Sequence, residues 1–361
     1  MKRILIDARE FVPLRFTGIG HFIEGLVDAL TQLEEIEIML ACYRADDLPP
    51  RLSPTNKIRF WTVPNDFLKS ELTLSNLSSH GFALFISPYP KLPLFGLHCP
   101  SVHTIHDVLD LQYPLYRKRF RVFFDKRRLR KALRSSCLTW YDSEWSLKET
   151  KALAGSVGGN PRVRHLGIDD QFNDILQESD TTVLGKYGLK AGYILIVGNG
   201  SPHKNLGLLL SISGCIARKL VFVGASNRNR QYWERRYPAK QAIWIERVDD
   251  TEMPSLMRYA FCLSQPSLAE GYGYPPLEAM ACGTPTVVSN IPVLVETTGG
   301  NALVADPRDG GSWIAAYRLF ENENAYRTQA EKGIRWVANL RGRGGWRHHV
   351  SDIEKLLGRC L

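Results

Sequence analysis

The chain has 361 residues, more than one hydrophobic core usually supports, so two domains of ordinary size are expected. Hydrophobic residues make up 44% and charged residues 23%, which is typical of a globular protein and excludes a disordered one. The net charge of +9 is concentrated between Arg117 and Arg134, where ten Lys and Arg residues accompany a single acid, so the rest of the chain is neutral.

No apolar run reaches the roughly 18–20 residues that a membrane span needs. Met1-Lys2-Arg3 leads straight into a short strand-like stretch, unlike a signal peptide, so we expect a cytoplasmic protein. The seven cysteines are scattered without a C-x-x-C pair, and the nine histidines show no H-E-x-x-H spacing. We therefore expect neither a disulfide framework nor a metal, and no cofactor.

The first half of the chain alternates between short apolar runs and amphipathic segments. After the strand-like run 3–8 comes the turn Gly18-Ile19-Gly20, and then a helical pattern with apolar residues from Phe22 to Leu30. Such alternation predicts a parallel sheet covered by helices. The further strand-like runs of this half are 37–41, 57–63, 82–86, 101–105 and 136–141.

A second alternating series begins at Tyr193, after a polar stretch over 169–184. The boundary is therefore placed near residue 175, with domains over 1–175 and 176–335. Residues 336–361 are expected to form a helical segment that packs back on the first domain. The strand-like runs of the second series are 193–198, 219–224, 242–246, 261–265 and 286–289.

The segment from Gly198 to Asn205 follows one of these strands and contains Lys204. Ser201 is a candidate N-cap and Pro202 a candidate first helical residue. Free backbone N–H groups at a helix start, beside a lysine, suit a phosphate. A glycine turn with a solvated lysine is the structural alternative.

A second motif runs from Ser267 to Pro285 and contains two glutamates. Glu270 lies in a glycine-rich loop, and Glu278 is expected in the first turn of a helix opened by Pro275-Pro276, where the helix dipole favours a carboxylate. Carboxylates placed in this way can accept hydrogen bonds from the hydroxyls of a ribose and a hexose. A capping glutamate and an exposed loop glutamate are the alternative.

This motif closely resembles the donor-site signature of glycosyltransferase family 4, in which seven residues separate two glutamates. The segments 193–206 and 291–307 resemble the flanking parts of the same family's second domain, and Thr104-Ile105-His106-Asp107 and Thr17-Gly18-Ile19-Gly20 resemble motifs of its first. The resemblance implies a GT-B fold, with two Rossmann-like, doubly wound parallel-sheet domains facing across a cleft. It also implies a retaining, metal-independent hexosyltransferase.

The resemblance assigns roles to individual residues. Glu278 is expected to bind the donor ribose, Glu270 to contact the transferred sugar near its reacting carbon, and Lys204 to pair with the diphosphate. Glu270 and His106, which would lie under the sugar near the acceptor, are the candidate catalytic residues. His203 stands where many members have arginine, so it adds charge only when protonated. The backbone positions expected along the phosphates and sugar are Gly18, Gly20, Gly271, Tyr272 and Gly273.

The basic segment 117–134 suggests a membrane surface. In a helix, Val122, Leu129 and Leu133 share one face, while Tyr116 and several phenylalanines lie opposite. Aromatic and basic side chains together suit anionic lipid, and a solvated basic helix whose aromatics are core is the alternative. The candidate membrane-binding residues are Arg117, Lys118, Arg119, Phe120, Arg121, Phe123, Phe124, Arg127 and Arg128.

Together these features predict transfer of a hexose from a GDP- or UDP-sugar to a lipid-linked or saccharide acceptor in cell-surface polysaccharide assembly. The segments Pro202-His203-Lys204-Asn205 and Pro275-Pro276-Leu277-Glu278 resemble the mannosyltransferase-type branch of the family, which favours GDP-mannose as the donor. The expected location is the inner face of the cytoplasmic membrane. A sugar-nucleotide epimerase or hydrolase of the same fold is the nearer alternative. A nucleic-acid-binding protein is a remoter one, because the positive charge is confined to one segment and no nucleic acid motif is present.

Overall fold

The computed structural model describes residues 1–12, 17–112, 119–238 and 242–359. The chain divides into two compact units, each built on one sheet. Unit 1 comprises Met1–Gly167 and Gly342–Leu361, and unit 2 comprises Ile168–Arg341. The first division therefore lies a few residues before the expected position near 175, and the C-terminal segment belongs to unit 1.

Unit 1 contains a seven-stranded sheet in the order β3-β2-β1-β4-β5-β6-β7, with all neighbouring strands parallel. Its strands are β1 (Lys2–Asp7), β2 (Ile36–Cys42), β3 (Ile58–Thr62), β4 (Leu84–Ser87), β5 (Ser101–Ile105), β6 (Leu138–Tyr141) and β7 (Pro161–Val163). Its α-helices are α1 (Gly18–Leu30), α2 (Phe67–Leu77), α3 (Leu109–Gln112), α4 (Arg119–Ser135), α5 (Glu144–Ala154) and α14 (Arg347–Arg359).

Unit 2 contains a six-stranded parallel sheet in the order β10-β9-β8-β11-β12-β13. Its strands are β8 (Tyr193–Val197), β9 (Leu220–Val223), β10 (Ala242–Ile245), β11 (Ala260–Gln265), β12 (Thr286–Ser289) and β13 (Leu303–Ala305). Its α-helices are α6 (Asp180–Lys186), α7 (Leu206–Ser211), α8 (Asn227–Arg236), α9 (Met253–Arg258), α10 (Tyr274–Ala281), α11 (Pro292–Thr297), α12 (Gly310–Phe320) and α13 (Glu323–Val337).

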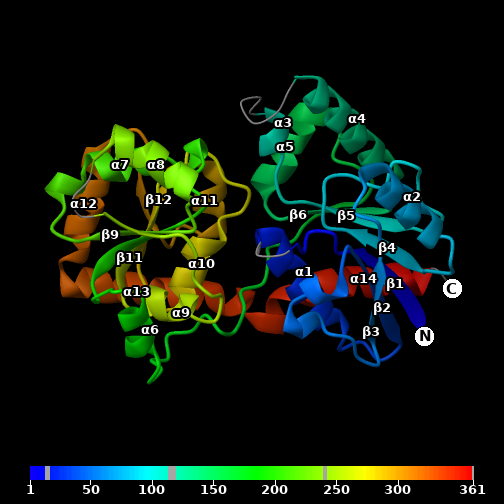
Figure 1. Cartoon of the computed structure of the whole chain (residues 1–361), viewed down its shortest axis with the longest axis horizontal. Coiled ribbons are helices and arrows are strands. Elements are labelled where there is room, and N and C mark those ends of the chain that lie inside the picture. The colour runs from blue at the N-terminus through cyan, green and yellow to red at the C-terminus, as the bar shows by residue number, and fades with distance from the viewer. Residues whose placement is uncertain (13–16, 113–118, 239–241, 360–361) are drawn as a thin grey trace. The chain divides into compact units, whose positions relative to one another are not determined.

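The strand order reverses once in each sheet, between β1 and β4 in unit 1 and between β8 and β11 in unit 2. The prediction of two doubly wound parallel α/β domains is thereby confirmed. In unit 2, α7 and α8 lie on one side of the sheet, and α9, α10 and α13 lie on the other (Figure 1). Reversal points matter for function, because ligands of such sheets bind beyond the carboxyl ends of the strands at these positions.

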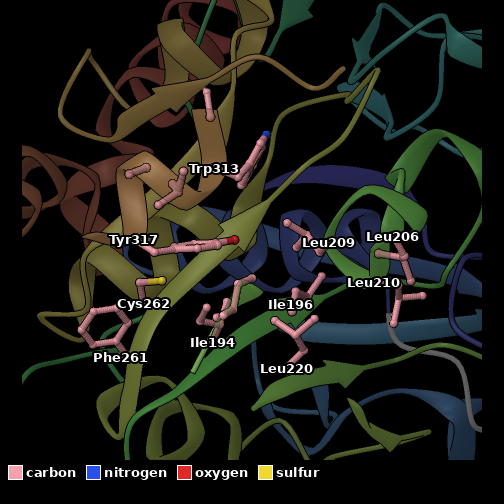
Figure 2. Close-up of a cluster of buried hydrophobic side chains, with 14 of the residues drawn as sticks. Ile194, Ile196, Leu206, Leu209, Leu210, Leu220, Phe261, Cys262, Trp313 and Tyr317 are labelled. Carbon is pink, nitrogen blue, oxygen red and sulfur yellow. The ribbon is translucent and has the colours of Figure 1, made fainter. Parts of the chain in front are cut away.

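The core of unit 2 explains why its strands read as continuous apolar runs. Ile194 and Ile196 of β8 and Leu209 of α7 are buried together with Trp313 and Tyr317 of α12 (Figure 2). A parallel sheet covered on both faces buries successive side chains of a strand, so no polar alternation is needed.

Unit 1 is completed by the end of the chain, which lies beside its beginning (Figure 1). The Trp346 indole is buried 5.5 Å from the Phe22 ring of α1, and Asp352 of α14 pairs with Arg164. Lys2 donates a hydrogen bond to the Leu357 carbonyl. None of the described helices has the length and apolar character needed to cross a bilayer.

Candidate functional site

The two motifs of unit 2 meet at the reversal point of its sheet. β8 and β11 are hydrogen-bonded neighbours, and the loop with Lys204 follows the first while the loop with Glu270 follows the second. Both loops leave the carboxyl edge of the sheet, where this architecture places ligands. Residues distant in sequence are thus brought to one site.

Hydrogen bonds between the loops fix their relative positions. Asn205 adopts a left-handed conformation with φ of 54°, which asparagine tolerates better than most residues. Its side-chain amide donates to the carbonyls of Pro266 (3.0 Å) and Pro307 (2.8 Å). The Leu268 amide also donates to the His203 carbonyl at 2.8 Å. Asn205 was part of the sequence motif, but its role as a link depends on tertiary contacts.

The start of the helix after β8 differs from the expectation. Pro202–Lys204 forms a single 3-10 turn, and α7 begins only at Leu206. Ser201 precedes the turn without a side-chain capping bond. The left-handed Asn205 interrupts the helical backbone, which explains why Pro202 does not open α7. His203 and Lys204 therefore lie on the 3-10 turn and not on an α-helix.

Lys204 and Glu270 form an ion pair at the centre of this site. The Lys204 ammonium lies 2.8 Å from both oxygens of the Glu270 carboxylate. Burial alone would raise the pKa of Glu270, but the Lys204 charge and the hydrogen bonds to the carboxylate outweigh it, so the pKa is lowered. Glu270 is therefore a buried, ionised carboxylate.

Glu278 has the opposite electrostatic character. It is the fifth residue of α10, because the helix begins at Tyr274 and not at the prolines, so it lies beyond the first turn where it was expected. Burial, followed by the nearby charges of Asp250 and Asp169, raises the pKa of Glu278 to about 8. No described side chain forms a hydrogen bond or ion pair with this carboxyl, which leaves it available to a ligand.

The glycine loop between the two glutamates has a structural requirement of its own. Gly273 has φ of 93°, and a Cβ there would lie 2.6 Å from Cδ2 of Leu294. The turn into α10 thus needs glycine whether or not a ligand is present. In the loop between Glu270 and α10, Tyr272 is buried and Gly271 is partly exposed.

In unit 1, His106 follows β5 and is paired with an acid that the sequence motifs did not single out. Its Nδ1 lies 2.5 Å from Oδ2 of Asp142, which follows β6. Burial would lower the pKa of His106, but the charge and hydrogen bond of Asp142 outweigh it, so the pKa is raised. The available signal for Asp142 was its place directly after a strand neighbouring β5, at the same sheet edge.

Gly18 and Gly20 lie in the first turn of α1 and not in a turn before it. Thr17 is the N-cap, and its hydroxyl oxygen accepts a hydrogen bond from the Gly20 amide at 3.2 Å. Thr17 also donates to Glu10, at 2.7 Å. The start of α1 is therefore well formed after β1, beside the reversal point of the first sheet.

The basic segment forms α4, with Leu129 and Leu133 in the core as expected. Phe123 and Phe124 are exposed, and the Arg127 guanidinium lies 5.9 Å from the centre of the Phe123 ring. Arg117 and Lys118 lie outside the described residues, and of Arg119, Phe120 and Arg121 only the backbone is described.

Arg128 corrects the prediction of a uniformly exposed basic face. Its guanidinium is buried and donates to Glu71 of α2 at 2.6 Å and to the Leu92 carbonyl at 3.0 Å. A buried carboxylate needs charged partners, and Glu71 has two, Arg128 and Arg9, the second at 3.2 Å. Arg128 therefore belongs to the packing between α2 and α4 and not to an exposed surface.

The structure brings Lys204 and Glu270 into direct contact and places Glu278 on the helix that follows. It also reveals two residues to which the sequence reasoning gave no role, Gln265 and Ser267, which bond to Glu270. Among the residues described, no group of three or more His, Cys, Asp or Glu is arranged to hold a metal ion.

The chain is similar to known proteins in sequence and in fold. Residues 185–336, most of unit 2, match the family model described as Glycosyl transferases group 1. The O-antigen chain mannosyltransferase B of Escherichia coli is 28% identical over 334 residues, covering 84% of this chain and 87% of that protein.

Two solved structures have a similar fold. Sucrose-phosphate synthase of Thermosynechococcus elongatus matches with a TM-score of 0.77 at 17% identity, covering 99% of both chains. HepE of Anabaena, solved in complex with UDP-glucose, matches with a TM-score of 0.76 at 14% identity, covering 98% of this chain and all of that one. The parallel sheets, the group 1 family match over most of unit 2 and the relatives together support a glycosyltransferase of the GT-B fold.

Proposed function

We propose that this protein transfers mannose from GDP-mannose, with retention of anomeric configuration and without a metal ion, to a lipid-linked or saccharide acceptor in O-antigen assembly. The observation that carries the proposal is the Lys204–Glu270 ion pair at the β8/β11 reversal point, with Glu278 on the next helix. The choice of mannose and O-antigen follows the name of the Escherichia coli relative.

The chemistry of each proposed contact follows from its side chain. Lys204 supplies positive charge for the diphosphate, which leaves with growing negative charge as the glycosidic bond breaks. Glu278 accepts or donates hydrogen bonds at the ribose, and Glu270 contacts the mannose near its reacting carbon. The backbone of Gly271, Tyr272 and Gly273 follows the phosphates and sugar, with His203 adding charge when protonated.

Unit 1 is proposed to serve the acceptor. His106 is held at the end of β5 by Asp142, so its ring orientation is fixed for a contact with sugar or acceptor. Gly18 and Gly20 lie in the first turn of α1, a suitable place for phosphate oxygens, and the Gly20 amide would exchange its bond to Thr17 for one to phosphate. The departing phosphate is proposed to take the acceptor's proton, on the face from which the nucleotide leaves.

Peripheral contact with an anionic membrane at the inner face of the cytoplasmic membrane completes the proposal. The exposed Phe123 of α4 lies beside the exposed Arg127. α2 has exposed apolar side chains of its own, and its Phe67 ring lies 5.8 Å from the Arg128 guanidinium of α4. Such a mixture of apolar and cationic groups binds anionic lipid surfaces. The exposed apolar residues of α2 are Phe67, Leu68 and Leu72.

Thermal-shift measurements with GDP-mannose, UDP-glucose and ADP-glucose test the donor. A bound donor stabilises the fold by RT ln(1 + [L]/Kd), so GDP-mannose is expected to raise Tm most.

Glu278→Ala should weaken donor binding, and Glu270→Ala should mainly lower turnover. The product's anomeric proton signals should report retention, and EDTA should leave the rate unchanged. Equal kinetics of both variants and wild type would refute the site.

A further inference from the structure

The carboxylate of Glu270 accepts more hydrogen bonds than its pairing with Lys204 requires. Oε1 accepts from Lys204 at 2.8 Å, from the Ser267 hydroxyl at 2.5 Å and from the Gln265 amide. Within the described residues, Oε2 accepts only from Lys204, at 2.8 Å. One oxygen is thus saturated by protein donors, while the other depends on the lysine.

The hydrogen bonds around Oε1 have one consistent direction. The Gln265 amide nitrogen donates both to Glu270 and to the Ser267 oxygen (3.1 Å), and the Ser267 hydroxyl donates onward to Glu270. The Gln265 carbonyl oxygen is buried without a partner among the described residues. The reversed amide would bring that oxygen against the carboxylate, so repulsion from Glu270 sets this orientation.

All three side chains are buried, with Ser267 at 0% and Gln265 at 1% exposure and Glu270 at 7%. Gln265 is the last residue of β11 and Ser267 lies two residues beyond it, so the end of the strand positions both side chains. Sites whose supporting side chains are locked by packing hold their geometry most closely.

Under the proposed function, two anionic groups compete for the Lys204 ammonium. In the structure it neutralises Glu270, yet a bound diphosphate would attract the same group. If a buried carboxylate lost its lysine and had no other hydrogen-bond donor, its ionised form would be energetically costly. The carboxylate would then bind a proton.

We propose that Gln265 and Ser267 are positioning residues that anchor Oε1 of Glu270, so that Lys204 can pass to the donor diphosphate while the carboxylate stays anionic and turns Oε2 toward the transferred sugar. This inference rests on the proposed function and explains how one lysine serves both groups. Neither residue touches substrate, and both act through Glu270.

Loss of the Ser267 hydroxyl or of the Gln265 amide changes the pKa of Glu270 in a known direction. Lys204 is the charged side chain that acts on this carboxylate, and hydrogen bonds to the ionised form lower its pKa further. Ser267→Ala or Gln265→Leu removes such a bond, so the pKa of Glu270 rises. The acid limb of the kcat profile then moves to higher pH, by about one unit.

Steady-state kinetics against pH with GDP-mannose provide the first measurement. Ser267→Ala and Gln265→Leu are expected to lower kcat about ten- to a hundredfold, the range for losing a hydrogen bond to a charged group, with little change in donor KM. Ser267→Thr keeps a hydroxyl donor and should restore the rate. Ser264→Ala is the matched control, because Ser264 is equally buried on β11 but bonds to the Tyr317 hydroxyl.

Infrared difference spectra against Glu270→Gln titrate the carboxylate without turnover. With GDP bound, the wild-type Glu270 band should remain that of a carboxylate at neutral pH, and in Ser267→Ala it should protonate at higher pH. Equal titration of Glu270 in wild type, Ser267→Ala and Gln265→Leu would overturn the proposal. Failure to turn over any sugar nucleotide would instead count against the proposed function, while the titration of the free protein still tests the anchor.

Discussion

Glu270 and Glu278 belong to one loop-and-helix segment, yet their pKa values are shifted in opposite directions. Burial raises the pKa of both, but only Glu270 has a lysine and two neutral donors to reverse the effect. For Glu278 the nearby acids Asp250 and Asp169 add to burial. Position in the motif therefore does not determine protonation, because the side chains around each carboxyl do.

Glu278→Gln is expected to change how stability depends on pH. The folded-state pKa of about 8 lies above the ordinary glutamate value of 4.5, so between these values the folded chain binds more protons and loses stability as pH rises. The variant lacks this loss. Relative to wild type it should gain roughly 2–4 kcal/mol between about pH 5 and about pH 8. Urea unfolding, monitored by hydrogen exchange of the β8 and β11 amides, measures the difference in stability between variant and wild type at each end of this pH range.

Glu331→Gln on α13 is the control for this comparison, because Glu331 is exposed and pairs with Arg335 one turn away. Its difference from wild type should be the same at both pH values. A Glu278→Gln difference that is also independent of pH would contradict the electrostatic description of the site.

At the scale of elements, the apolar runs located most strands well, and the runs 101–105 and 286–289 coincide with β5 and β12. β7 and β13 were missed because each has only three residues, and Pro161 opens β7. So short a strand carries no periodicity, and it forms because a neighbouring strand offers hydrogen bonds. Local sequence does not contain that partner.

The site shows the same division between local and tertiary information. The motifs identified the loops with Lys204 and Glu270, since glycine and proline patterns are local. They did not reveal that Gln265 and Asp142 bond to the candidate residues, because those contacts depend on side-chain direction at the ends of strands. The start of α10 was also displaced by one residue, and with it the turn that contains Glu278.

Adjacent arginines of α4 provide a matched test of surface against interior. Arg128→Ala should lower the free energy of unfolding by roughly 1–3 kcal/mol, because buried Glu71 loses one of its two arginine partners and keeps Arg9. Arg127→Ala should stay within about 0.5 kcal/mol, because Arg127 is exposed. Hydrogen exchange in β1 and β4 reports the stability of unit 1.

Vesicle binding should rank the same two variants in the opposite order, with Arg127→Ala affected more than Arg128→Ala. Arg127→Ala should weaken cosedimentation with phosphatidylglycerol vesicles about fivefold, the effect of one basic residue near the surface. Folded Arg128→Ala should bind as wild type does. Weaker vesicle binding by Arg128→Ala alone would argue against the membrane role of the exposed face of α4.

At the scale of the whole molecule, the two ends of the chain build one unit. Gly25 on α1 makes room for the Trp346 indole, since a Cβ there would lie 2.5 Å from the ring. The indole and α14 cover α1, so the end of the chain fills the core of unit 1.

Gly25→Ala is therefore expected to destabilise unit 1 by roughly 1–3 kcal/mol through overpacking against Trp346. Gly185→Ala on α6 has open space at its Cβ, and it should stabilise unit 2 by about 0.5–1 kcal/mol. Hydrogen exchange resolves the two units separately. Equal effects of the two substitutions would mean that Trp346 does not pack against α1 as described.

Gly342–Leu361 completes unit 1 but is synthesised after all of unit 2. The unit that begins first in the sequence is therefore the last to be complete. During synthesis the whole of unit 2 is made before Trp346 and α14, which cover the α1 surface around Phe22. Domains fold as units during translation, usually the N-terminal one first. Here the C-terminal Rossmann-like unit has its complete sequence before the N-terminal unit does, so it is expected to be the first unit that can fold.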